Sequence, residues 1–174
     1  SIWISYNSLV KECCDNDLCH HLCHFDSHRR LATPVTAWEQ LKIGGGTPPI
    51  LTPSGWLFLY HGVCEALNKP DLAGKLSYSA GLLLLDEKLP HVIRYRSPEP
   101  VLAPEVPEES TGIVPNVVFP TAIDRRDDQG LPDRFDVYYG MADSRIGVAR
   151  LNLPEHLPAE AKQQGAIEPH RALT

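Results

Sequence analysis

The sequence contains no long hydrophobic run and no excess of positive charge. No apolar run approaches the ~20 residues of a transmembrane helix, and the first residues lack the basic start and apolar core of a signal peptide, so we expect no membrane partner. A net charge of −6 gives no electrostatic reason to bind nucleic acid. An initiator methionine is also absent, which predicts a fragment. The composition, 43% hydrophobic, is that of a globular domain with a core.

A CxxC pair is also absent, although potential zinc ligands crowd into residues 11–30. They are Cys13, Cys14, Cys19, His20, His21, Cys23, His24 and His28. They are too many and too evenly scattered for a structural zinc site, so we favour a weakly packed, metal-free loop over a zinc-binding module. The odd total of five cysteines disfavours a closed disulfide framework and favours reduced thiols and a cytoplasmic location.

The rest of the chain predicts an all-β fold. Sixteen prolines and twelve glycines separate short apolar runs, which is typical of strands joined by many turns. Residues 1–6 alternate as a strand does. We expect antiparallel strands at 48–51, 56–61, 79–85 and 92–96, and a second set at 116–121, 135–139 and 146–151. Residues 97–109 read as a proline- and acid-rich connector, and residues 154–174 as a separate C-terminal tail with a short helix.

The two sets of strands form an internal repeat. Residues 59–65 align with 137–143, because each stretch is an apolar-aromatic strand followed by a glycine and a carboxylate. Repeats of four-stranded units are the signature of a β-propeller, whose blades bury their faces against neighbouring blades. In an open propeller, faces carrying Leu82, Leu84 and Val118 would lack their neighbours, so we expect homo-oligomers, aggregation or marginal stability.

A run of three glycines, Gly44–Gly46, organises the first set. It allows positive φ, so a ligand or another strand can approach the backbone closely, and we interpret it as a turn. Lys42 precedes the glycines and His61 ends the next strand, so the two side chains are expected to meet at one rim. Two basic groups beside exposed backbone N–H groups suit an anion such as phosphate. The alternative is a solvated lysine, an ordinary turn and a histidine that caps a strand.

Five motifs follow one another along the chain: Lys42–Ile50, Tyr60–Gly62, Arg96–Pro100, Val114–Pro120 and Tyr138–Asp143. In order and content they resemble the C-terminal half of glycoside hydrolase family 130, whose members are five-bladed propellers and include β-mannoside phosphorylases and some β-mannosidases. The resemblance covers about residues 36–153. It implies that residues 1–153 are a partial propeller of about two to two and a half blades.

The resemblance also implies roles for individual residues. By position, Lys42 and His61 would hold phosphate, while Gly45, Asn116 and Asp143 would contact a β-mannoside oligosaccharide. Phosphate would attack the anomeric carbon with inversion and release mannose 1-phosphate, with no cofactor besides this co-substrate. The family's catalytic acid and its phosphate-binding arginines belong to the N-terminal half. No catalytic residue is therefore assigned here, and the fragment alone is expected to be inactive.

Two alternatives stay open within the resemblance. The family's hydrolases replace the phosphate-holding basic residues and use water, so the presence of Lys42 and His61 favours a phosphorylase over a β-mannosidase. A non-catalytic carbohydrate-binding propeller is the second alternative. Residues 11–30 do not resemble the family's corresponding segment, which indicates an insertion, a divergent loop or a reading-frame error.

Overall fold

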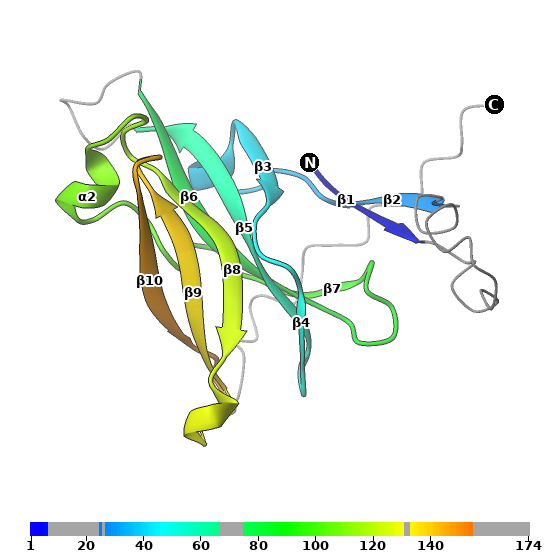
Figure 1. Cartoon of the computed structure of the whole chain (residues 1–174). Coiled ribbons are helices and arrows are strands. Elements are labelled where there is room, and N and C mark those ends of the chain that lie inside the picture. Colours follow the sequence, from blue (N-terminus) through cyan, green and yellow to red (C-terminus); the bar gives the residue numbers. More distant parts are fainter. Residues whose placement is uncertain (7–24, 26, 67–74, 131–132, 155–174) are drawn as a thin grey trace, which may run out of the picture.

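Antiparallel β-sheets make up almost all of the regular structure. The computed structural model describes residues 1–6, 25, 27–66, 75–130 and 133–154. These residues form ten strands in three antiparallel sheets, which confirms the predicted all-β class (Figure 1). Within these ranges no helix is long and apolar enough to cross a membrane. Closure of the sheets into a five-bladed ring stays a prediction.

The central sheet has the strand order β3-β5-β6-β7. Its two long strands, β5 (Gly55–Glu65) and β6 (Leu76–Leu85), are apolar on both faces and extend beyond the predicted segments. Strand β7 (Ile93–Arg96) lies on the outside of β6. On the other side, β3 (Lys42–Gly45) and β4 (Ile50–Thr52) both pair with β5. The prediction of a strand at 48–51 was therefore only partly right.

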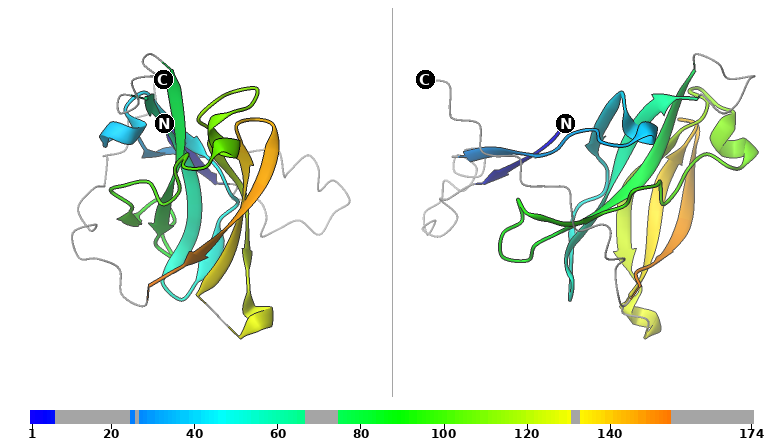
Figure 2. Two further views of the ribbon diagram at one scale, coloured as in Figure 1. Left: turned by 90° about the vertical axis from the view of Figure 1, so that its left-hand side faces the viewer. Right: turned by 180° about the vertical axis from the view of Figure 1, so that it is seen from behind.

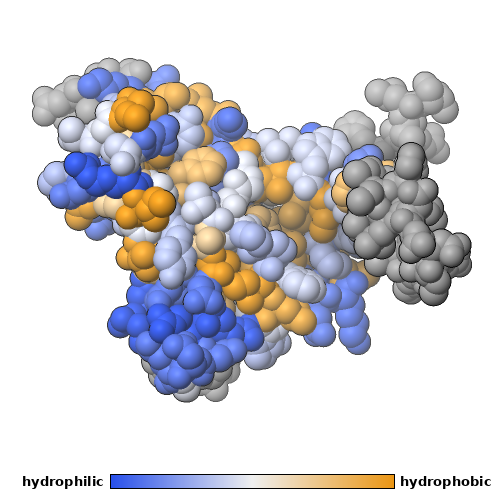
Figure 3. Space-filling model, viewed as in Figure 1, coloured by the Kyte–Doolittle hydropathy of each residue, from blue (hydrophilic) through white to orange (hydrophobic). Residues whose placement is uncertain are grey.

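A second sheet with the order β10-β9-β8 packs beside the central one (Figure 2). It consists of β8 (Val118–Arg125), β9 (Arg134–Met141) and β10 (Arg145–Asn152), close to the three predicted segments. The connector includes a short helix, α2 (Pro107–Ser110), that was not predicted. A 3-10 turn, η4 (Asp127–Gln129), joins β8 to β9 at the strongly hydrophilic lower end in Figure 3.

The first sheet is a pair of strands that stands away from the other two (Figure 2). Strand β1 (Ile2–Tyr6) confirms the predicted N-terminal strand and pairs with β2 (Ser27–Ala32). The predicted loop at 11–30 is thus wrong at its end, because residues 27–30 belong to β2. Residues 7–24 and 26 lie outside the described residues, as do 155–174. Of the cysteines and histidines in the predicted loop, His28 alone is among the described residues. A short turn, η2 (Ala37–Glu39), follows β2.

The core lies on both faces of the central sheet. On one face, Phe58, Tyr60 and Leu83 pack against Trp38 and residues of the first sheet. On the other face, leucines of β5 and β6 pack against the second sheet. The expectation of exposed faces at Leu82, Leu84 and Val118 was wrong: their exposed fractions are 3%, 1% and 0%, because the two sheets cover one another. The apolar residues left exposed on β10 are instead Ile146 (79%) and Val148 (56%).

The internal repeat exists in the structure, but its register differs by one residue from the predicted alignment. Tyr60 pairs with Gly81 on the next strand of its sheet, and Tyr139 pairs with Gly147 on the next strand of the second sheet. Both tyrosine hydroxyls also donate to a buried glutamate. Tyr139 is therefore the counterpart of Tyr60. Tyr138, which the alignment matched to Tyr60, points to the opposite face because side chains alternate along a strand.

Candidate phosphate and sugar site

The stretch that was predicted to be a glycine turn is a strand. Gly44 and Gly45 belong to β3, and none of Gly44–Gly46 has a positive φ. Lys42 pairs with Val63, and Gly44 pairs with His61. Residues opposite one another, and every second residue along a strand, share a face. Lys42, Gly44 and His61 therefore lie on one face of the central sheet, where β3 pairs with β5.

Two of the three glycines, Gly44 and Gly46, are required by close packing and not by unusual backbone angles. A Cβ atom at Gly44 would lie 2.4 Å from Cε1 and 2.7 Å from Nε2 of His61. One at Gly46 would lie 2.7 Å from the carbonyl oxygen of Leu59 and 2.8 Å from Cγ of Pro120. A Cβ at Gly45 would meet nothing within 4 Å. Gly45, which was predicted to contact sugar, therefore borders open space.

His61 is buried and fixed in one tautomer. Its Nδ1 lies 3.0 Å from the carbonyl oxygen of Gly45, and its ring centroid lies 4.5 Å from that of Phe119. A carbonyl oxygen only accepts, so Nδ1 carries the proton and Nε2 of the neutral ring keeps a lone pair. Burial lowers the pKa of His61, the hydrogen bond to Gly45 opposes this, and the charge of Lys42 lowers the pKa further. The neutral ring is therefore the resting form.

Asn116 supplies unpaired polar groups next to this histidine. Its exposed fraction is 2%, and neither its side-chain oxygen nor its side-chain nitrogen has a hydrogen-bond partner among the described residues. Buried amides without partners are rare and costly, so they point to a polar ligand. The backbone oxygen of Asn116 accepts from the N–H of Tyr78 at 2.9 Å, and the Tyr78 ring lies 6.2 Å from that of His61.

Asp143 lies at the tip of the β9–β10 hairpin and is exposed. Ala142 and Asp143 have φ angles of 46° and 50°, and the N–H of Ser144 donates to Met141 O at 3.1 Å. These are the features of a type I′ turn. The N–H of Ala142 also donates to the carbonyl oxygen of Val117 at 2.9 Å, which ties the hairpin to the residue after Asn116.

The predicted site residues thus gather at one end of the two larger sheets. His61 and Asn116 are buried, and the half-buried rings of Tyr78 and Phe119 lie next to His61, while Lys42 and Asp143 are exposed. The sequence analysis missed Tyr78, which lies just before the predicted strand 79–85. Phe119 was part of a quoted motif, but nothing in the sequence indicated that it stacks on a histidine.

Comparisons with known proteins place the chain in a family. The family model for glycoside hydrolase family 130, described as β-1,4-mannooligosaccharide phosphorylase, matches residues 12–158. The β-1,4-mannooligosaccharide phosphorylase of Ruminococcus albus is 39% identical over 126 residues, which are 72% of this chain and 35% of that protein. The β-1,2-mannobiose phosphorylase of a Thermoanaerobacter species is 42% identical over 112 residues, or 64% of this chain and 32% of that protein.

Solved structures agree with the sequence comparison. The complex of Listeria innocua β-1,2-mannobiose phosphorylase with β-1,2-mannobiose has a TM-score of 0.59 at 30% identity, over 74% of this chain and 33% of that one. A structure described among glycoside hydrolases that target β-1,2 mannosidic linkages in Candida mannan has a TM-score of 0.57 at 30% identity, over 72% and 34%. The chain spans about a third of the length of these relatives. It belongs to glycoside hydrolase family 130.

Proposed function

We propose that this chain supplies the phosphate subsite and part of the sugar subsite of a β-mannoside phosphorylase. The observation that carries the proposal is the arrangement around His61. Its ring is fixed by Gly45 and Phe119, Gly44 leaves room for it, and Lys42 lies on the same face. A fixed imidazole and an ammonium group together suit a phosphate anion. The names of the similar proteins, which are phosphorylases, support the same reaction.

The state of His61 specifies how phosphate would bind. In the neutral ring Nδ1–H is used by Gly45, so Nε2 can only accept a hydrogen bond. It therefore fits the P–O–H group of a partly protonated phosphate, and Lys42 would neutralise one of the remaining oxygens. Protonation of Nε2 would turn this atom into a donor for the dianion, at the cost of charging a buried ring. Only the second route favours binding at lower pH, because HPO4²⁻ also carries a P–O–H group.

In the proposed reaction a phosphate oxygen forms a bond to the anomeric carbon of the mannoside while the glycosidic C–O bond breaks. The departing oxygen takes a proton from a carboxylic acid, and the product is mannose 1-phosphate of inverted configuration. We assign that acid to a part of the protein outside these residues. The unpaired amide of Asn116, with Asp143 and the Gly45 backbone, would bind hydroxyl groups of the sugar.

A β-mannosidase that uses water is the second candidate, because one of the similar structures belongs to hydrolases of β-1,2 mannosides. The two candidates differ in product. We would test them with a chimera in which residues 36–153 replace the aligned segment of the Ruminococcus albus relative. With a β-mannoside as substrate, phosphorus NMR should show mannose 1-phosphate that appears only when phosphate is added. Free mannose at a rate independent of phosphate would support the hydrolase instead.

A further inference from the structure

Two glutamates, one in η2 and one in α2, occupy equivalent buried positions beside the central and second sheets. A side-chain oxygen of Glu39 accepts from the backbone N–H groups of Val35 and Thr36, at positions i−4 and i−3. Glu109 accepts in the same way from Glu105 and Val106. The second oxygen of each carboxylate accepts from the tyrosine of the repeat, at 2.9 Å from Tyr60 and at 2.7 Å from Tyr139. Each short turn thus contributes a glutamate to the same carboxylate–tyrosine unit.

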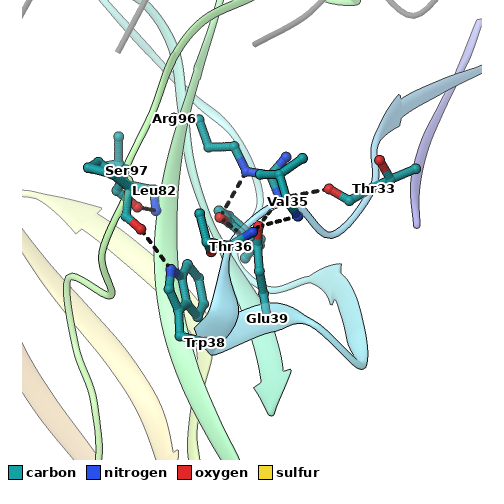
Figure 4. A network of polar contacts seen from close by, with 10 residues as sticks. Thr33, Val35, Thr36, Trp38, Glu39, Leu82, Arg96 and Ser97 are labelled. Carbon is teal, nitrogen blue, oxygen red and sulfur yellow. Dashed lines mark hydrogen bonds and ion pairs between the residues drawn. The ribbon is translucent and has the colours of Figure 1, made fainter. Parts of the chain in front are cut away.

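The two units differ in one component, a cation. Arg96 places Nη2 at 2.7 Å from Glu39 and donates through Nε to the hydroxyl of Tyr60 (Figure 4). Among the described residues no cation pairs with Glu109, although its exposed fraction is only 3%. The pKa of Tyr139 is raised to about 12 by burial and by Glu109, with no opposing positive charge. Arg96, in contrast, opposes the rise in the pKa of Tyr60. A buried carboxylate without a cation is costly.

The repeat shows where the second cation belongs. Arg96 lies on β7, where it pairs with Leu83 of β6. Leu83 is two residues after Gly81, and Ala149 of β10 is two residues after Gly147, so Ala149 is the counterpart of Leu83. Within the described ranges no strand pairs with the outer edge of β10, and Ile146 and Val148 beside it are exposed. An unpaired edge of this kind is a template for another strand.

We propose that β10 binds a further antiparallel strand that carries an arginine opposite Ala149, and that the guanidinium of this arginine pairs with Glu109. The strand comes from the part of the protein beyond these 174 residues, since the chain matches only about a third of the length of its relatives. The second sheet then has a fourth strand and a buried ion pair, as the central sheet already has. The pair is independent of the proposed phosphate subsite.

A copy of β7 is the probe that tests this pairing. A labelled peptide with the sequence of residues 92–100 is titrated into the chain, together with two variants in which citrulline, a neutral isostere, replaces Arg96 or Arg94. Arg94 is the matched control, because its side chain is 52% exposed in the central sheet. We expect citrulline at position 96 to weaken binding about tenfold or more, and citrulline at position 94 to have little effect.

The protein side is tested by Glu109→Gln, with the exposed neighbour Glu108→Gln as control. In Glu109→Gln the peptide variants should bind alike, whereas in Glu108→Gln the preference for arginine at position 96 should persist. Nuclear Overhauser contacts between peptide position 96 and Ala149 should locate the strand. Equal affinities of the arginine and citrulline peptides for the unmodified chain would overturn the proposal. So would pairing of β10 with a second copy through Arg145, seen as a dimer that Arg145→Ala dissociates and that the peptide does not disrupt.

Discussion

Glu39 and Arg96 form a salt bridge of 2.7 Å in which the two side chains are 0% and 6% exposed. The bond joins the turn after β2 to the last strand of the central sheet. Arg96 also donates to the carbonyl oxygen of Thr33 at 2.9 Å, so the guanidinium links the backbone before η2 to Tyr60 in the middle of the sheet. Each buried charge is neutralised only while the other is present. The pair therefore holds η2, the turn that follows the first sheet, against the central sheet.

Removal of Arg96 should consequently destabilise the fold far more than removal of a surface arginine. In Arg96→Met the carboxylate of Glu39 stays buried without its cation, and we expect a loss of about 3–5 kcal/mol in the free energy of unfolding. Arg94→Met is the matched control on the same strand. Its bridge to Asp86 is 3.6 Å long and largely exposed, so its loss should cost less than about 1 kcal/mol. Urea unfolding of both variants measures the difference, and equal losses would refute the role of burial.

Gly44→Ala and Gly45→Ala should differ although the residues are neighbours. A methyl group at Gly44 would meet the His61 ring at 2.4 Å and force it to move, whereas a methyl group at Gly45 meets nothing within 4 Å. We expect Gly44→Ala to shift the imidazole resonances of His61 and to weaken phosphate binding about tenfold or more, because the fixed ring contributes a directed hydrogen bond. Gly45→Ala should leave the His61 resonances in place. Identical spectra for the two variants would contradict the packing described here.

The buried state of His61 makes stability depend on pH. Its folded pKa is lower than the ordinary value of 6.5, so below pH 6.5 the unfolded chain takes up a proton that the folded chain does not. The contribution of His61 is therefore fully present above pH 6.5 and is lost as the pH falls towards the folded pKa. In His61→Asn the free energy of unfolding should decrease less steeply between pH 7 and pH 5. An unchanged slope would show that His61 titrates alike in both states.

The exposed apolar strip on β10 should cause the isolated chain to associate. Ile146 and Val148 lie on the outer face of the second sheet, where no described residue covers them. Ile146→Lys and Val148→Lys together should shift sedimentation towards monomer at the same concentration. Leu89→Lys is the control, since Leu89 is also exposed (53%) but belongs to the connection between β6 and β7. If the unmodified chain is already monomeric, Ile146 and Val148 do not cause it to associate.

The sequence predicted the strands well where apolar residues are continuous, as in β5 and β6. It mispredicted Gly44–Gly46 because a glycine run is equally compatible with a tight turn and with a strand packed closely against a ring. Only the pairing of Gly44 with His61 on the neighbouring strand distinguishes the packed strand from the turn. Residues 27–30 were assigned to a loop because Ser27-His28-Arg29-Arg30 has no apolar alternation. Their strand is defined by pairing with β1.

Part of the candidate site could also be predicted from the sequence. Lys42, His61, Asn116 and Asp143 stand in motifs that resemble a family, and the structure places them at one end of the sheets. The stacking of Phe119 on His61 and the unpaired amide of Asn116 depend on contacts between separate sheets, which no local pattern encodes. The carboxylate–tyrosine units were missed for the same reason, because Glu39 lies 21 residues from Tyr60, and Glu109 lies 30 residues from Tyr139.

The central claim is that Lys42 and His61 bind phosphate, and the phosphate dependence of the reaction tests it most directly. In the chimera with the Ruminococcus albus relative, Lys42→Ala and His61→Asn should each raise the KM for phosphate about tenfold or more. Lys42→Ala removes a hydrogen bond to a charged oxygen, and His61→Asn removes the acceptor of the P–O–H group. The KM for the mannoside should change much less. If both variants keep the phosphate KM of the unmodified chimera, the phosphate subsite lies elsewhere and the account is wrong.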